Sequence, residues 1–378
     1  MVRTLRGTSG LVLLLIFLAL SVKVSTASAA NWWESVALKG DFRFRHEMID
    51  EEGKDARNRQ RIRARLAVQG DVAPGIGVVI QLATGSSDPV SANQTLGDAG
   101  STKSIGLDLA YAKATHKKLP GITLMAGKMK NPLHEPGGTE LIWDGDWNPE
   151  GGALQIEHSS KVVSFEATGG AFWLVERSST DDSWLGAIQG LATAKFDEGK
   201  STATVGGSYF DFVNTRYYPP FYDASNGMGN TVISVEESNG ATSVYYANKY
   251  QLVEFFAEAS HKFESTPVGV FFDFVTNTSA DSLDTGWLLG LSAGRLKKPG
   301  DWQVNYTYRK VEKDAVVGAF TDSDFRGGGT DGKGHEFGGA VQVAEHTALH
   351  ATFFLNKRGL QGAGTDYSRL QVDAQLKF

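Results

Sequence analysis

The chain has 378 residues, a formal net charge of −6 and no cysteine. The lack of cysteine excludes disulfides. After the first 30 residues, no stretch approaches the eighteen or so consecutive apolar residues that a transmembrane helix needs.

The first segment, residues 1–30, has the composition of a secretory signal peptide. Arg3 and Arg6 supply a basic start, and the apolar run 11–20 is too short to span a bilayer. An A-x-A cleavage site follows at residues 27–29. We expect cleavage there, so that the mature chain begins at Ala30 or Asn31.

A ladder of arginines follows soon after, with one arginine on every second residue. Its members are Arg57, Arg59, Arg61, Arg63 and Arg65. Residues two apart scatter around a helix but share one face of a strand. The other face is mostly apolar, and each arginine placed in lipid would cost roughly 2–4 kcal/mol. We therefore expect this strand to face a water-filled lumen with its arginines, beside Arg43 and Arg45 of the preceding strand, and we expect no nucleic-acid partner.

Apolar and polar residues alternate in about sixteen segments, each long enough for a tilted membrane-crossing strand. We predict strands at 36–46, 58–70, 76–85, 104–116, 122–130, 152–158, 161–175, 184–196, 201–213, 251–263, 267–276, 286–296, 301–311, 335–344, 347–356 and 367–378. The predicted fold is an all-β transmembrane antiparallel barrel that encloses an aqueous channel. The register of two predicted strands stays open. In 122–130 two apolar residues share a face with two lysines, which either a bulge near Gly127 or a position of the lysines at the rim would explain. In 201–213 either register places a residue on the outer face that does not suit lipid.

The predicted connections alternate in length, as they do in outer-membrane barrels with short periplasmic turns and long extracellular loops. The short ones are 71–75, 117–121, 197–200, 264–267 and 297–300. The long ones are 47–57, 86–103, 131–150, 214–250, 312–334 and 357–366. An even strand number places both termini on the periplasmic side.

The alternation continues to a terminal aromatic residue, Phe378. Such an ending is similar to the signal that outer-membrane barrels present to the barrel-assembly machinery. We expect Phe378 to act as this assembly signal.

Several motifs resemble functional sites but lack an essential residue. Residues 327–334 miss the hydroxyl residue of a phosphate-binding loop, and 322–327 miss the acids of a calcium-binding EF-hand. The eight histidines show no H-E-x-x-H pattern. We expect no enzymatic activity, no cofactor and no dedicated metal site.

Seven segments, in this order, resemble the putative porin family of Gram-negative outer membranes. They are LKGDFRFRHE, RNRQRIRARLAVQG, LDLAYAKATH, GKMKNP, WDGDWNPEGGALQ, DAVVGAFTDSDF and LQVDAQLKF. The resemblance implies a homotrimeric diffusion channel in the outer membrane, surrounded by lipid and lipopolysaccharide, that passes small hydrophilic solutes.

The loop 131–150 is the candidate constriction of this channel. It carries five acids, Glu135, Glu140, Asp144, Asp146 and Glu150, and four large apolar residues, Leu141, Ile142, Trp143 and Trp147. In general porins the loop at this ordinal position folds into the barrel, and the apolar residues here favour burial against the inner wall. The acids would then oppose the arginine ladder across the pore. Two alternatives remain from sequence: a substrate-specific channel for anions such as phosphate, and a barrel that sheathes an electron-transfer protein.

Overall fold

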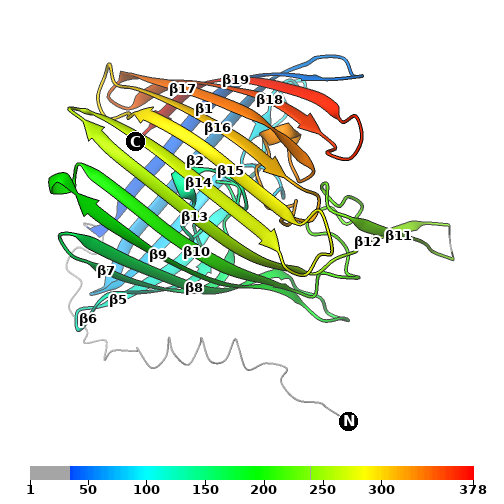
Figure 1. The fold of residues 1–378 in the computed structure, drawn as a ribbon, viewed down its shortest axis with the longest axis horizontal. Coiled ribbons are helices and arrows are strands. Elements are labelled where there is room, and N and C mark those ends of the chain that lie inside the picture. The colour runs from blue at the N-terminus through cyan, green and yellow to red at the C-terminus, as the bar shows by residue number, and fades with distance from the viewer. Residues whose placement is uncertain (1–34, 239) are drawn as a thin grey trace, which may run out of the picture.

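The computed structural model describes residues 35–238 and 240–378, and the expected signal peptide lies outside this range (Figure 1). The described residues contain no helix long and apolar enough to cross a membrane. The strands are β1 (Ala37–Glu51), β2 (Arg57–Ala73), β3 (Ile76–Thr84), β4 (Gln94–Thr95), β5 (Ile105–His116), β6 (Leu119–Lys128), β7 (Glu150–Ser159), β8 (Val163–Val175), β9 (Ser183–Phe196), β10 (Ser201–Val213), β11 (Val232–Glu236), β12 (Thr242–Tyr246), β13 (Tyr250–Phe263), β14 (Thr266–Asn277), β15 (Thr285–Gly294), β16 (Trp302–Val311), β17 (Gly332–Ala344), β18 (Thr347–Arg358) and β19 (Thr365–Lys377). Short 3-10 turns lie at η2 (Pro136–Gly138), η3 (Asp197–Gly199) and η4 (Phe325–Gly327).

Sixteen of these strands form one closed antiparallel barrel, which confirms the predicted fold class. Each barrel strand pairs with its neighbour in the chain, and β1 closes the ring by pairing with β19. The two-residue β4 adds to the edge of β2, and β11 pairs only with β12. The tilted wall of the barrel is visible in Figure 1.

The two faces of each strand differ as the sequence alternation predicts. On β1, Phe42 and Phe44 are about 40% exposed on the outer face, whereas Asp41, Arg45 and Glu47 are buried on the inner one. An exposed apolar band on the outside is what lipid contact requires. The barrel therefore has an apolar exterior and a polar interior.

The structure settles the two open registers and corrects one loop. β6 pairs with β7 without a bulge near Gly127 and ends at Lys128, so the lysine stands at the rim. On β10 the awkward outward residue is Asp211, at the end of the strand, where Gln251 donates a hydrogen bond to it. The predicted long loop 47–57 is wrong: β1 and β2 extend so far that only residues 52–56 connect them.

Two long connections pack against the inner wall, and a third packs there in part while its hairpin projects outward. Residues 129–149 and 312–331 contribute many of the buried apolar side chains, together with inward residues of the wall. The connection between β10 and β13 buries Phe221 and Tyr246 in the same cluster. Its β11–β12 hairpin extends away from the barrel at the long-loop end (Figure 1). The two inward segments determine the geometry of the interior.

Candidate functional site: a charged aperture inside the barrel

Acidic side chains from neighbouring strands contact the arginine ladder of β2. Asp41 on β1 lies opposite Arg65 in the register, and its Oδ2 is 2.6 Å from Arg65 Nε. The other oxygen of Asp41 is 3.1 Å from Arg63 Nη2. On the opposite side of β1, Asp373 accepts hydrogen bonds of 2.7 and 2.8 Å from Arg45. The arginines thus belong to a network of ion pairs.

Glu47 is the most enclosed acid of this network, because its side chain has no exposed area. It pairs with Arg59 of β2 and Arg369 of β19, and Arg61 Nη1 lies 3.6 Å away. A buried carboxylate is tolerated only when it is paired and hydrogen-bonded. Part of the ladder therefore holds Glu47 in place.

Arg43, on the strand beside the ladder, has fewer close acidic partners for its positive charge than Arg45 has. Its Nη2 donates a 2.7 Å hydrogen bond to Asn93, a neutral amide, and its Nη1 is 4.0 Å from Asp373. The positive charge of Arg43 is therefore less neutralised than that of Arg45, which has a bidentate partner.

The segment 129–149 is anchored by its two tryptophans. The rings of Trp143 and Trp147 stack with centroids 4.3 Å apart, and both side chains are at most 4% exposed. Trp143 also contacts Phe210 and Phe212 of β10, and Trp147 meets Phe172 of β8. Leu141 and Ile142 are buried in the same cluster. The apolar half of this loop thus packs on inward-facing side chains.

The polar half of the same loop faces the arginines. Asp146 Oδ1 is 3.3 Å from Arg63 Nη1 and 3.5 Å from Arg65 Nη1. Its Oδ2 accepts a hydrogen bond from the backbone N–H of Ala92. Asp144 accepts two further backbone hydrogen bonds, from Asp146 and Ser323, which fix its orientation.

These groups line one cavity of about 470 Å³, which we call the aperture. Its basic side includes Arg43, Arg63 and Arg65, and its acidic side includes Glu140, Asp144 and Asp146. The structure therefore brings together six of the residues that the sequence singled out. A field between the two sides is strong because the walls have a low dielectric.

A second inward segment, residues 312–331, completes the network and was not assigned to the site from the sequence. Asp324 lies 3.1 Å from Arg45 and 2.7 Å from Arg369, and Asp322 lies 2.9 Å from Arg309. Although burial opposes it, the Arg369 and Arg45 guanidiniums hold the pKa of Asp324 far below its usual range. The apolar run 315–320 in this segment was a usable signal, since a solvated loop rarely carries one.

Burial raises the pKa of Glu140 well above its usual range, and the adjacent carboxylates of Asp144 and Asp322 raise it further. Burial and the neighbouring Asp146 and Asp322 raise the pKa of Asp144 in the same direction. One oxygen each from Glu140, Asp144 and Asp322 lies within 4.8 Å of the others, the arrangement among the described residues that could hold a cation. Arg309 neutralises Asp322, whereas no ion pair among the described residues neutralises Glu140 or Asp144, so no ion pair offsets the upward shift of their pKa values.

The other six predicted charged residues do not line the aperture. Arg45, Arg59 and Arg61 belong to the ion-pair network around Asp373 and Glu47, and the remaining three lie elsewhere. Glu150 is the first residue of β7 and pairs with Lys128 across the sheet at 2.9 Å, because the chain has returned to the wall there. Glu135 accepts a hydrogen bond from Asn131, and the neighbouring η2 turn packs against β13 and β14. Arg57 is exposed at the start of β2. None of the three lines the aperture.

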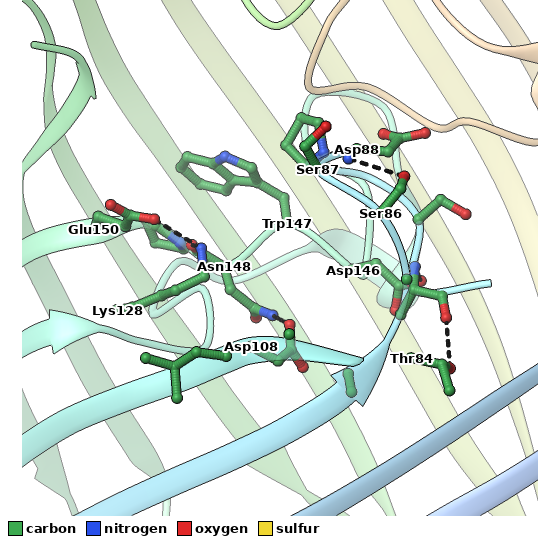
Figure 2. A pocket seen from close by; sticks show the side chains of 18 of the residues that line it. Thr84, Ser86, Ser87, Asp88, Asp108, Lys128, Asp146, Trp147, Asn148 and Glu150 are labelled. Atoms are coloured by element: carbon green, nitrogen blue, oxygen red, sulfur yellow. Dashed lines mark hydrogen bonds and ion pairs between the residues drawn. The ribbon is translucent and has the colours of Figure 1, made fainter. Parts of the chain in front are cut away.

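A second hollow of about 750 Å³ adjoins the aperture and shares Asp146 and Asn148 with it (Figure 2). Asn148 Nδ2 donates a 2.7 Å hydrogen bond to Asp108 of β5, which ties the end of the loop to the wall. Lys128 and Glu150 close one side of this hollow in Figure 2. Asp146 therefore lies between the aperture and this second hollow.

Phe378 pairs with Gly40 of β1 through two backbone hydrogen bonds of 2.9 and 3.0 Å. A Cβ at Gly40 would lie 2.5 Å from the Phe378 ring, so glycine is needed for this close approach. The terminal aromatic is 63% exposed on the outer surface. Its role as an assembly signal stays a prediction.

A family model described as a putative porin matches residues 50–231 and 247–378. The chain belongs to the putative porin family. The unmatched interval, residues 232–246, coincides with the β11–β12 hairpin. No curated protein matches the chain.

Solved porins and outer-membrane proteins share the fold of this porin. Pseudomonas putida OprB aligns with a TM-score of 0.58 and 10% identity over 92% of this chain and 95% of its own. Salmonella typhi OmpF, in a complex with daunomycin, aligns with a TM-score of 0.55 and 11% identity over 91% and 97%. Vibrio cholerae OmpT in a trimer form aligns with a TM-score of 0.53 and 12% identity over 91% of this chain and 100% of its own. At these identities the likeness shows the fold alone, and family and fold together support an outer-membrane porin channel.

Proposed function

We propose that this porin is a passive diffusion channel for small hydrophilic solutes and ions, and that the aperture is its narrowest part. The observation that carries this proposal is the meeting of Arg43, Arg63 and Arg65 with Glu140, Asp144 and Asp146 around one cavity. A transverse field there favours ions and dipolar solutes, while an apolar solute loses water without compensation. The channel would lie in the outer membrane as a homotrimer, a state supported by the trimer form of the OmpT relative in fold.

The two alternatives have less support. A conduit for an electron-transfer protein needs a wide lumen, whereas residues 129–149 and 312–331 pack inside this barrel. A dedicated anion site needs unpaired cations, whereas Arg45, Arg63 and Arg65 each contact a carboxylate within 3.2 Å. The paired arrangement favours a diffusion channel.

The test is single-channel recording in planar bilayers, with reversal potentials in asymmetric salt. Wild-type protein should give steady, open channels. Arg43→Gln should lower the anion-to-cation permeability ratio by roughly tenfold. One unit charge about 6 Å from an ion in water contributes roughly 0.7 kcal/mol, and this energy has opposite signs for an anion and a cation, so the ratio changes by about 1.4 kcal/mol. Arg57→Gln is the matched control, since Arg57 is an arginine of the same ladder outside the aperture.

Two results would contradict the proposal. A folded barrel without conductance would exclude a diffusion channel. Equal shifts in Arg43→Gln and Arg57→Gln would show that selectivity is set by the total charge of the lumen and not at the aperture.

A further inference from the structure

The second hollow, of about 750 Å³, has an excess of negative charge. Its lining includes four carboxylates and one lysine: Asp88, Asp108, Asp146, Glu150 and Lys128. Lys128 pairs with Glu150, and Asp146 pairs with two arginines of the aperture. Asp88 and Asp108 instead accept hydrogen bonds from neutral groups and have no ion pair among the described residues. Two carboxylates of the hollow therefore carry negative charge that no cation neutralises.

Asp108 enters this hollow from a β-bulge. Gln81 of β3 pairs with Leu109 of β5, but the next residue of β3, Leu82, pairs with Leu107. Asp108 is therefore an extra residue, and Leu107 is 54% exposed whereas Leu109 is only 7% exposed. In a regular strand, residues two apart share a face and would not differ in this way. Bulges re-aim a side chain, and they are common beside functional sites.

The groups that hold Asp108 leave room for a cation with N–H donors. Its carboxylate accepts hydrogen bonds of 2.6 Å from Gln81 and 2.7 Å from Asn148, which are both neutral amides. Asn148 also lines the hollow and is 9% exposed, and its carbonyl oxygen is buried without a hydrogen-bond donor among the described residues. A buried acceptor of this kind costs free energy until a donor reaches it. An N–H group of a bound cation would supply that donor.

Asp88 belongs to the connection between β3 and β5, and in Figure 2 it lies at the top of the hollow while Asp108 lies near the base. It accepts a 3.1 Å hydrogen bond from the backbone N–H of Val90. Burial raises the pKa of Asp88, although this hydrogen bond and the charge of Arg61 act in the opposite direction. Burial disfavours an uncompensated carboxylate, so a cation beside Asp88 would be stabilised.

The arrangement fits an extended organic dication better than a metal ion. Neither Asp88 nor Asp108 belongs to the described group of carboxylates whose oxygens lie close enough to share one ion. Trp173 is 50% exposed and lines the same hollow, where its ring offers a surface for methylene and ammonium groups. A short aliphatic diamine combines two positive charges with an apolar stem, and it therefore matches both the acids and the ring.

We propose that the second hollow binds small aliphatic diamines, with one ammonium group at Asp108 and the other at Asp88. The ammonium group at Asp108 would also donate to the carbonyl oxygen of Asn148. Because Asp146 and Asn148 line both spaces, a bound diamine would stand beside the aperture and impede the ion current through it. This inference rests on the proposed function, since the block is seen only when a current flows.

The experiment is single-channel recording with each probe added to either side of the bilayer in turn. The probes are 1,4-diaminobutane, butylamine, 1,4-butanediol and magnesium chloride. Asp108→Asn and Asp88→Asn each remove one charge with little change in size. Asp98→Asn is the matched control, because Asp98 is an exposed acid of the same connection that does not line the hollow. Isothermal titration calorimetry of the detergent-purified, folded protein measures binding without a current.

We expect 1,4-diaminobutane to block at a lower concentration than butylamine, and 1,4-butanediol to have no effect. Either Asp108→Asn or Asp88→Asn should raise the half-blocking concentration of the diamine by roughly fivefold, the effect in water of one unit charge about 4 Å away. Asp98→Asn should leave the half-blocking concentration unchanged, because its charge lies outside the hollow.

Three results would overturn the inference. Equal block by 1,4-butanediol would show occlusion without recognition of charge, and equal block by magnesium would identify an inorganic cation as the ligand. An unchanged half-blocking concentration in both variants would place the diamine elsewhere. A folded protein without conductance would count against the proposed function instead, and calorimetry would then decide the diamine site: binding that Asp108→Asn weakens would support it, and the absence of binding would overturn it.

Discussion

The docking of segment 129–149 depends on its two tryptophans, so replacing both with alanine should open the aperture. A buried aromatic side chain covers roughly 150–250 Å². At roughly 25 cal/mol per Å², each ring contributes about 4–6 kcal/mol of burial. Measured losses for buried tryptophan are closer to about 3–5 kcal/mol, since the site partly collapses. Because both rings are at most 4% exposed and stack on each other, a single replacement should lower the docked-to-undocked ratio by roughly a thousandfold.

The assay for Trp143→Ala/Trp147→Ala is single-channel recording together with a heat-modifiability gel that reports the folded barrel. We expect a larger and noisier conductance and a relaxed size cutoff for sugars, with the barrel still folded. Trp302→Ala is the control, because this tryptophan is 48% exposed on the outer face. Unchanged conductance and noise in a folded double variant would refute the reasoning, since the segment would then be held by its polar contacts alone.

Other predictions concern charge, pH and closure. Glu140 and Asp144 become charged only as the pH rises through their raised pKa values, so cation preference should grow with pH and docking of the segment should weaken. Reversal potentials in acidic and mildly alkaline buffers check this, and Glu140→Gln/Asp144→Asn should reduce the pH dependence; an unchanged dependence would contradict the assignment. Arg369→Gln breaks pairs with Glu47 and Asp324 and should cost about 3–5 kcal/mol, read from the urea midpoint of unfolding; an unchanged midpoint would mean that the network contributes nothing to stability. Deletion of Phe378, or Gly40→Val, should impair assembly more than expression, and a normal yield of folded protein would argue against an assembly signal. N-terminal sequencing should find Ala30 or Asn31 first, and finding residues 1–20 in the mature protein would exclude cleavage.

The strands were predictable because lipid on one side and water on the other impose a period of two on every segment. The ends of the strands were less predictable. Strand β1 continues to Glu51 because its inward acids extend the polar face beyond the point where the apolar alternation fades. The hairpin β11–β12 was hidden inside a long loop, since its short strands lack a buried face to enforce alternation.

The candidate site was predictable in part. The period of two predicted the arginine ladder, and the composition of loop 131–150 predicted Asp146. The ion pairs between them depend on the strand register, which the sequence does not give. Alternation alone places Asp41 and Glu47 on the same inward face as Arg43, so these acids were within reach of the sequence. The contacts of Asp324 were not, because they depend on how residues 312–331 fold back across the lumen.

The β11–β12 hairpin is a separate unit, because its two strands pair only with each other and not with the barrel wall. The residues on either side of it are already joined, since the N–H of Ala247 donates a 3.0 Å hydrogen bond to the carbonyl of Thr231. Excising residues 233–245 would therefore leave Val232 and Tyr246 as two paired ends and would keep the buried Tyr246 in place, and a short peptide with closely spaced ends could be inserted there. Such a position is suited to the insertion of an epitope, because the change leaves every strand of the wall the same.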